Sequence, residues 1–186
     1  EARRRQAEVA DLLDRANDAV LYVSPHGRVL DCNARAEGLY GRSRSELQAL
    51  TVGDLRADEA QAGTHDDLAR ANAGGTIFET VHRHRDGTSI PVEVSSRPID
   101  RPGGRVLVSI VRDIRERRRA EARIRQLNRL LRTISEIDQA VVRADAVRPL
   151  LGEACRILVE HGGFALAWIG LREAGDPPLP VTAAAP

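Results

Sequence analysis

The sequence predicts an α+β fold in which an antiparallel five-stranded sheet carries helices on one face. Three observations support this prediction: short β-prone runs fall into two groups, helical segments with clear start signals lie between the groups, and turn-forming residues join the strands within each group. The chain has 186 residues, which exceeds the usual domain size of about 100–150 residues. We therefore expect one complete domain over residues 18–114 and part of another over residues 136–186.

The first group of strands is a hairpin followed by short helices. AVLYV at 19–23 and RVLDCN at 28–33 are β-prone and are separated by the turn SPHG. Asn33 can cap one short helix, and Ser43 with Glu46 has the spacing of a capping box for the next. The segment THDDLARANAGG at 64–75 then predicts a longer helix, which its two final glycines can end.

The second group supplies the three remaining strands. IFETVHRH at 77–84 and SIPVEVSSRPI at 89–99 flank an Asp-Gly turn, which is a strong hairpin signal between β-prone runs. The turn RPGG leads into the last strand, RVLVSIV at 105–111. This order of elements closes a single antiparallel sheet.

Two further helices are expected outside this domain. Residues 1–17 place apolar side chains on one helical stripe. Residues 115–135 begin almost directly after the last strand and repeat apolar side chains at spacings of three and four, as in a two-stranded coiled coil. The expected dimer seam consists of Ile124, Leu127, Leu131 and Ile134. We expect a homodimer through both helices, although the same stripe could instead pack inside the following domain.

Composition narrows the possible partners and the cellular location. The formal net charge of +1 gives no overall attraction to nucleic acid or anionic lipid, and no run approaches the roughly 18 apolar residues of a membrane span. Seven arginines crowd residues 112–125, but Glu116 and Glu121 interrupt them, so we expect no nucleic-acid partner. Cys32 and Cys155 lack metal-ligand spacing and are expected in the core of a cytoplasmic fragment that makes no membrane contact.

Residues 22–121 resemble a PAS (S-box) sensor domain. The resemblance rests on GRVLDCNARAEGLYGRSRSEL, HRHRDGTSIPVEVSSRPI and VRDIRERRRAE, the last of which is similar to the family's strand-ending Asp-Ile-Thr motif. Arg115 stands here where that motif usually has Thr. Residues 129–171 look like the opening helices and first strand of a GAF domain, which implies a truncated copy in which Phe164, Leu166 and Trp168 lack their usual cover.

These resemblances imply a sensory input and signal-relay module of a bacterial histidine kinase or of a cyclic-di-GMP enzyme such as a diguanylate cyclase or phosphodiesterase. The signal would pass from the PAS domain through Asp113-Ile114 to the helical linker and the GAF domain, and then to a downstream effector domain of the parent chain. Asp113 lies four residues before Arg117, a spacing that allows an ion pair across one helical turn. The alternative is that this pair only caps an exposed helix. No catalytic motif occurs, so we expect no enzyme activity in this chain.

A PAS cavity normally lies between the sheet and the helices. The expected lining residues are Tyr40, Leu55, Leu68, Ile77, Val92 and Val94. The whole chain has two Phe, two Tyr and one Trp, which favours a small or aliphatic ligand over flavin. The alternative is a close-packed core that binds no ligand.

Histidines suggest one cofactor alternative. His65 stands where haem-binding PAS domains carry their proximal ligand, so a haem or small-ligand receptor that uses His65 is the second function considered. His82 and His84 share one side of a strand, but no third ligand stands at matching spacing. We therefore expect no metal site and leave the cofactor unassigned.

Overall fold

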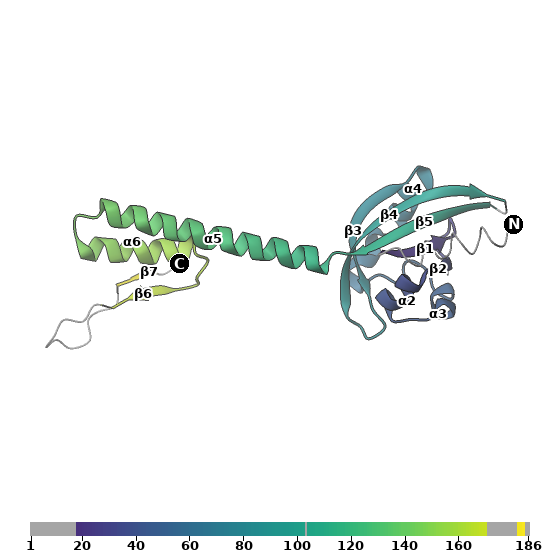
Figure 1. Ribbon diagram of the computed structural model, residues 1–186, viewed down its shortest axis with the longest axis horizontal. Helices are drawn as coiled ribbons and strands as arrows, with labels where there is room; N and C mark the ends of the chain where they lie inside the picture. Colours follow the sequence, from purple (N-terminus) through teal and green to yellow (C-terminus); the bar gives the residue numbers. More distant parts are fainter. Residues whose placement is uncertain (1–17, 103, 171–181, 185–186) are drawn as a thin grey trace. The chain divides into compact units, whose positions relative to one another are not determined.

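The computed structural model of the protein describes residues 18–102, 104–170 and 182–184 (Figure 1). The helix expected over residues 1–17 lies outside these described residues. The chain divides into two compact units, residues 1–117 and residues 118–186. Each unit is described by itself.

The first unit contains the predicted five-stranded antiparallel sheet. Its strands are β1 (Ala19–Val23), β2 (Val29–Cys32), β3 (Thr76–Arg83), β4 (Ser89–Arg101) and β5 (Gly104–Asp113). They are arranged in the order β2-β1-β5-β4-β3, and all neighbours are antiparallel. The helices that follow β2 are α2 (Ala34–Tyr40), α3 (Arg44–Gln48), the 3-10 helix η1 (Asp58–Gly63) and α4 (Thr64–Ala73). The expected order of strands and helices is confirmed.

Local sequence signals set the helix boundaries. The Asn33 side chain accepts hydrogen bonds from the amides of Ala36 and Val20, and it thereby joins the start of α2 to strand β1. Ser43 and Glu46 form the predicted capping box at the start of α3. Helix α2 ends at Gly41, whose φ of 65° lies in the left-handed region that favours glycine.

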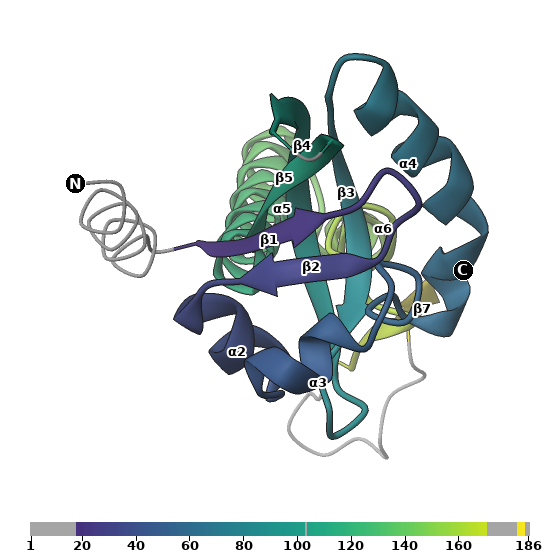
Figure 2. The same cartoon turned by 90° about the vertical axis from the view of Figure 1, so that its right-hand side faces the viewer.

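The core lies between one face of the sheet and the helices, which cover that face (Figure 2). Side chains alternate along β4, so Val92, Val94 and Ser96 are buried beneath the helices and Glu93 lies on the opposite face. Both cysteines are buried, as expected, with Cys32 in this core and Cys155 in the second unit.

The second unit is built on two helices. Its elements are α5 (Arg115–Arg143), which begins in the first unit, α6 (Val147–Glu160), β6 (Ala167–Ile169) and β7 (Thr182–Ala184). β6 and β7 pair as antiparallel strands, and β6 lies where the first strand was expected. Helix α5 continues past residue 135, so the expected boundary between linker helix and second domain falls inside one uninterrupted helix.

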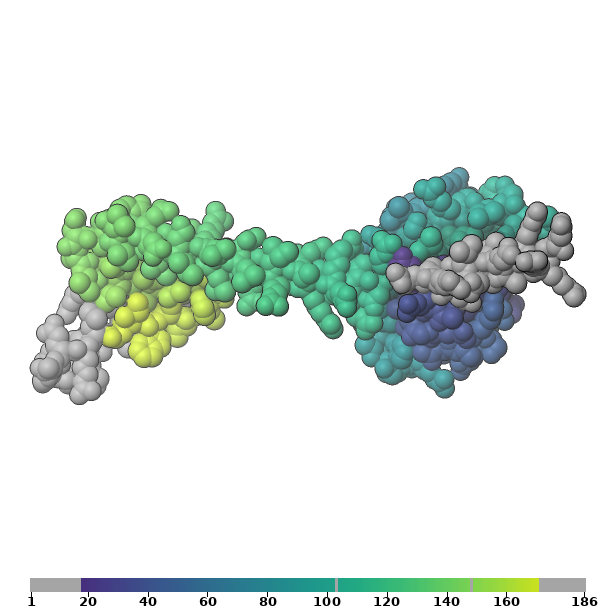
Figure 3. All heavy atoms as spheres, viewed as in Figure 1, coloured from purple at the N-terminus to yellow at the C-terminus, as the bar shows by residue number. Residues whose placement is uncertain are grey.

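Large apolar side chains of the second unit are exposed. Phe164, Leu166 and Trp168 are 50%, 58% and 63% exposed, which agrees with the expectation that they lack a covering surface. The predicted seam on α5 is also uncovered, and all four of its side chains are more than half exposed. Figure 3 shows the side chains of the first half of α5 standing free on the face in view. No helix of the described residues is long and apolar enough to span a membrane.

Candidate functional site

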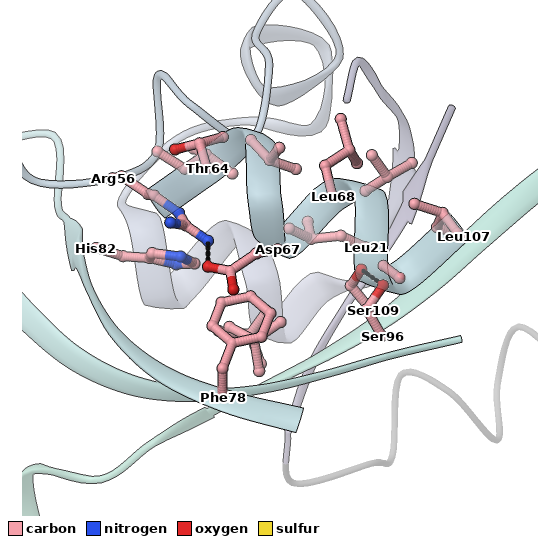
Figure 4. A pocket seen from close by; sticks show the side chains of 16 residues that line it. Leu21, Arg56, Thr64, Asp67, Leu68, Phe78, His82, Ser96, Leu107 and Ser109 are labelled. Carbon is pink, nitrogen blue, oxygen red and sulfur yellow. Dashed lines mark hydrogen bonds and ion pairs between the residues drawn. The ribbon is translucent and has the colours of Figure 1, made fainter. Parts of the chain in front are cut away.

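A partly open cavity of about 40 Å³ lies between helix α4 and the inner face of the sheet (Figure 4). Apolar side chains from four strands, α4 and the loop before η1 form most of its wall. The lining residues are Leu21, Val23, Val52, Leu55, Arg56, Thr64, Asp67, Leu68, Ala71, Phe78, His82, Val94, Ser96, Leu107, Ser109 and Val111. Phe78 and His82 are its aromatic members, so the wall is poor in aromatic surface, as the composition suggested.

Three of the six predicted lining residues line this cavity: Leu55, Leu68 and Val94. Tyr40 and Val92 are completely buried in the adjacent core but do not line it. The prediction was wrong for Ile77, which is 65% exposed. Side chains alternate along β3, and Phe78 rather than Ile77 faces the helices.

The haem alternative does not fit the structure. His65 is the second residue of α4, and its side chain is exposed and does not line the cavity. A proximal ligand must point at the iron, and a cavity of about 40 Å³ is far smaller than one of about 150 Å³, which holds only benzene. The histidine that does line the cavity is His82, which was not among the residues expected there.

A buried ion pair lies at one end of the cavity. Arg56 is 4% exposed, and its Nη2 donates to Oδ2 of Asp67 at 2.6 Å, while its Nη1 donates to the carbonyl of Ala60 at 3.2 Å. The guanidinium carbon also lies 5.2 Å from the centre of the Phe78 ring, within range of a cation–π contact. Asp67 forms a second ion pair with the exposed Arg70, so one carboxylate serves two guanidinium groups.

His82 lies beside this pair and is neutral at physiological pH. Its Nδ1 shares a hydrogen bond of 2.9 Å with the hydroxyl of Tyr40, which is itself completely buried. Burial, together with the positive charge of Arg56, lowers the pKa of His82 to about 3. Burial likewise raises the pKa of Tyr40, so both partners remain uncharged.

Hydroxyl groups complete the polar part of the cavity. The buried hydroxyls of Ser96 and Ser109 hydrogen-bond to each other at 2.9 Å, across the β4–β5 pair. Within the described residues, Oγ1 of Thr64 is buried and finds no hydrogen-bond partner. Since buried polar atoms are nearly always paired, this hydroxyl marks a place where water or a ligand group is needed.

No local pattern in the sequence singled out these polar residues. Arg56 stands between the buried Leu55 and Ala57, and this apolar context is the one signal that could have indicated a buried arginine. Its partner Asp67 is 11 residues away on another element. The pairing depends on tertiary structure: Arg56 and His82 form an isolated antiparallel bridge that fixes the loop before η1 against β3, and Asp67 lies on helix α4.

A second polar group lies on the opposite face of the sheet, where α5 begins. Glu79 on β3 and Glu93 on β4 are direct cross-strand partners, an arrangement that repulsion normally disfavours. Arg117 of α5 bridges them: its Nη2 donates to Oε1 of Glu79 at 2.5 Å, and its Nη1 donates to Oε2 of Glu93 at 3.4 Å. The first turn of the helix is thereby attached to two strands.

These ion pairs continue across the sheet toward β1. Arg112 on β5 lies 3.8 Å from Glu93 and 2.7 Å from Asp18, the residue that precedes β1. We call the set Asp18, Arg112, Glu93, Arg117 and Glu79 the outer ion row. It runs from the start of β1, across β5 and β4, to the edge strand β3.

The predicted Asp113–Arg117 pair is corrected by this geometry. Arg117 reaches the two glutamates of the sheet, and Asp113 pairs with Arg115, whose Nη2 lies 2.6 Å from Oδ2 of the aspartate. Asp113 also accepts the backbone amide of Arg115 at 2.9 Å, so it acts as a local cap for the helix. Ile114 between strand and helix is buried, and its amide donates to the carbonyl of Pro91.

Comparisons with known proteins agree with this architecture. The chain is 31% identical over 130 residues to a methyl sulfide methyltransferase-associated sensor of Methanosarcina acetivorans, and 28% identical over 120 residues to the cell-division control histidine kinase PdhS of Brucella ovis. These alignments cover 69% and 61% of this chain. The chain spans only 13% and 11% of the length of the two relatives.

Solved structures show the same fold. The crystal structure of a PAS domain from a two-component sensor histidine kinase matches with a TM-score of 0.55 at 18% identity, over 61% of this chain and 99% of that one. Residues 13–119, more than half of the chain, match the family described as PAS fold. The chain therefore belongs to the PAS-fold family, whose domains occur in sensors and histidine kinases of this kind.

Proposed function

We propose that this chain is a sensory input and relay segment of a histidine-kinase-like signalling protein and that it catalyses no reaction itself. In this proposal, a change at the cavity shifts strands β3, β4 and β5, and the outer ion row passes that shift to helix α5. The observation that carries the proposal is the position of Arg117, which attaches the first turn of α5 to two strands at once.

The cavity and the outer ion row share the same strands, which supports the coupling. β4 contributes Val94 and Ser96 to the cavity wall and Glu93 to the row. β3 contributes Phe78 and His82 to the wall and Glu79 to the row. A displacement of either strand therefore moves both groups together.

The remaining parts of the proposal concern residues after 117. The exposed seam on α5 would form a parallel homodimer, and the second unit would be the start of a GAF domain that leads to an effector domain of the parent chain. Four apolar side chains at heptad-like spacing, each more than half exposed, support the dimer.

Hydrogen exchange tests the proposed coupling. In a Glu79→Gln/Glu93→Gln variant, Arg117 loses both carboxylates, so the amides of residues 118–121, the first that can donate to a carbonyl four residues earlier, are expected to exchange about two- to fivefold faster, which corresponds to an exposed ion pair of up to about 1 kcal/mol. In 1 M sodium chloride the wild-type protein should approach the rate of the variant, since salt screens exposed charges.

A matched control is Asp100→Asn, which breaks the exposed Arg105–Asp100 pair at the far end of β4 and β5. This variant should leave hydrogen exchange at residues 118–121 unchanged. If the glutamate variant also leaves it unchanged, or if the control accelerates it equally, the outer ion row does not attach α5 and the proposed relay is wrong.

A further inference from the structure

We propose that the cavity binds a small monocarboxylate of two or three carbons, whose carboxylate group takes the place of the Asp67 carboxylate on Arg56. This inference names the ligand class of the site that the proposed function uses, and it rests on that function. It follows from the charge, the open hydrogen-bonding groups and the size of the cavity.

The carboxylate of Asp67 is shared between two guanidinium groups. Arg56 is buried and lines the cavity, whereas Arg70 is exposed to solvent and does not line it; His82 and Tyr40 are neutral. A monoanion would complete two ion pairs in place of one shared carboxylate. Asp67 can remain with Arg70 when its place on Arg56 is taken, because it already contacts both.

The hydrogen-bonding groups suit a planar carboxylate. A guanidinium group carries five N–H bonds, and it binds carboxylates through two parallel hydrogen bonds. In the described part of the chain, Nη1 and Nη2 of Arg56 donate one hydrogen bond each, to Ala60 and Asp67. The unpaired hydroxyl of Thr64 lines the same cavity and supplies a further donor (Figure 4).

The remaining space limits the length of the ligand. The carboxylate would occupy the position that Asp67 vacates, so the cavity volume of about 40 Å³ is left for the rest of the molecule. A cavity that holds one water measures roughly 10–15 Å³ on the same scale, and a methyl group is similar in size to a water, so a tail of one or two carbons fits. Leu21, Leu68, Val94 and Leu107 surround this space with apolar side chains.

Replacement of the Asp67 carboxylate on Arg56 by the ligand would also have a structural effect. The ion pair to Asp67 joins the first turn of α4 to the loop that holds Arg56, and Arg56 is bridged through its backbone to His82 on β3. Ligand binding would break the first of these links. The start of α4 would then be free to move relative to β3, which carries Glu79 of the outer ion row.

The test uses the full 186-residue chain with sodium acetate and sodium propionate as probes, at an ionic strength held constant with sodium chloride. Amide NMR signals of residues 56, 64 and 67 are expected to shift and saturate. Acetamide and propionamide have the same shape without the charge, and they should bind at least about tenfold more weakly. Shifts that do not saturate, or equal binding of the amides, would overturn the inference.

Three variants separate ligand recognition from a merely structural role. Arg56→Gln should abolish acetate binding, and Thr64→Val should weaken it about threefold or more, because each removes a donor. Asp67→Asn removes the competing carboxylate and should tighten binding severalfold. The control Asp66→Asn removes a neighbouring exposed carboxylate that does not line the cavity, and it should leave binding unchanged.

Weaker acetate binding by the Asp67→Asn variant would contradict the proposed replacement of the Asp67 carboxylate by the ligand, because an aspartate with a purely structural role gives that result. If Arg56→Gln does not fold, the opposite responses of the other two variants still decide the matter. Saturable acetate binding with no change in hydrogen exchange at residues 118–121 would disprove only the relay. An absence of binding, together with an intact response to the Glu79→Gln/Glu93→Gln change, would disprove only the carboxylate site.

Discussion

At the scale of single residues, the chain holds several polar side chains in its core. Arg56, His82, Ser96 and Ser109 are all more than nine-tenths buried. Burial of such groups is costly unless they are paired, and each has a partner inside the domain. Because His82 is buried, it stays neutral in the folded domain at pH values at which it would be protonated in the unfolded chain.

His82 should make the stability of the first unit depend on pH. Its pKa is about 3 in the folded protein and about 6.5 when the chain is unfolded, so the unfolded state alone gains a proton between these values. The contribution of His82 to stability is therefore fully present above pH 6.5 and is lost as the pH falls toward 3. We expect the contribution of His82 to be about 2 kcal/mol less favourable at pH 5 than at pH 8.

The variant His82→Asn keeps a hydrogen-bonding group near the Tyr40 hydroxyl but cannot gain a proton. Its free energy of unfolding, from urea denaturation at several pH values, should fall less between pH 8 and pH 5 than that of the wild-type protein. His26→Asn removes an exposed imidazole and should keep the wild-type slope. Equal slopes for all three proteins would show that His82 is not the group responsible.

At the scale of single elements, helix α2 has one glycine at its C-terminal end and one in its interior. Gly41 ends the helix with φ at 65°, and a Cβ built on it would lie 2.2 Å from Nε2 of His84. Gly38 lies inside the same helix, and a Cβ there would meet nothing within 4 Å. Position 41 therefore requires glycine, whereas position 38 has space for a side chain.

Alanine substitution should distinguish these positions. Gly41→Ala is expected to destabilise the first unit by about 1–2 kcal/mol, because it forces a side chain into the left-handed region and against His84. Gly38→Ala should stabilise it by about 0.5–1 kcal/mol, because alanine is the better helix former. Urea denaturation followed through the NMR signals of β5 measures both. A stabilising Gly41→Ala would mean that the end of α2 has another conformation.

Elements were predictable where the signal is local. The Asp-Gly turn between β3 and β4, the cap at Asn33 and the capping box at Ser43 depend on residues close in the sequence, and each is present. The face of β3 was misjudged at Ile77, because the stretch TIFETV permits either alternation until its pairing with β4 is known.

The polar contacts of the site depend on tertiary structure. Arg117 follows Glu79 by 38 residues, and Tyr40 precedes His82 by 42 residues. Helical spacing offered Asp113 as the partner of Arg117, but the sheet brings two glutamates within reach of the same guanidinium. Only the assembled sheet determines which ion pair forms.

At the scale of the whole molecule, the exposed stripe on α5 predicts a dimer. Leu127→Arg/Leu131→Arg places two charges in the expected seam and should give a monomer in light scattering, while the NMR signals of the sheet stay in place. The control Ala122→Arg/Gln126→Arg adds the same charge on the other side of the helix and should remain dimeric. A dimer in the seam variant would place the interface elsewhere.

One buried residue, Ile114, separates the end of β5 from the start of α5. The junction therefore contains no loop that could accommodate an extra residue. Each residue inserted after it turns everything downstream by about 100° around the helix axis, whereas seven residues make nearly two whole turns. Chimeras that graft this domain onto a foreign output should therefore keep or lose their response with the periodicity of the helix, and not simply with the length of the linker.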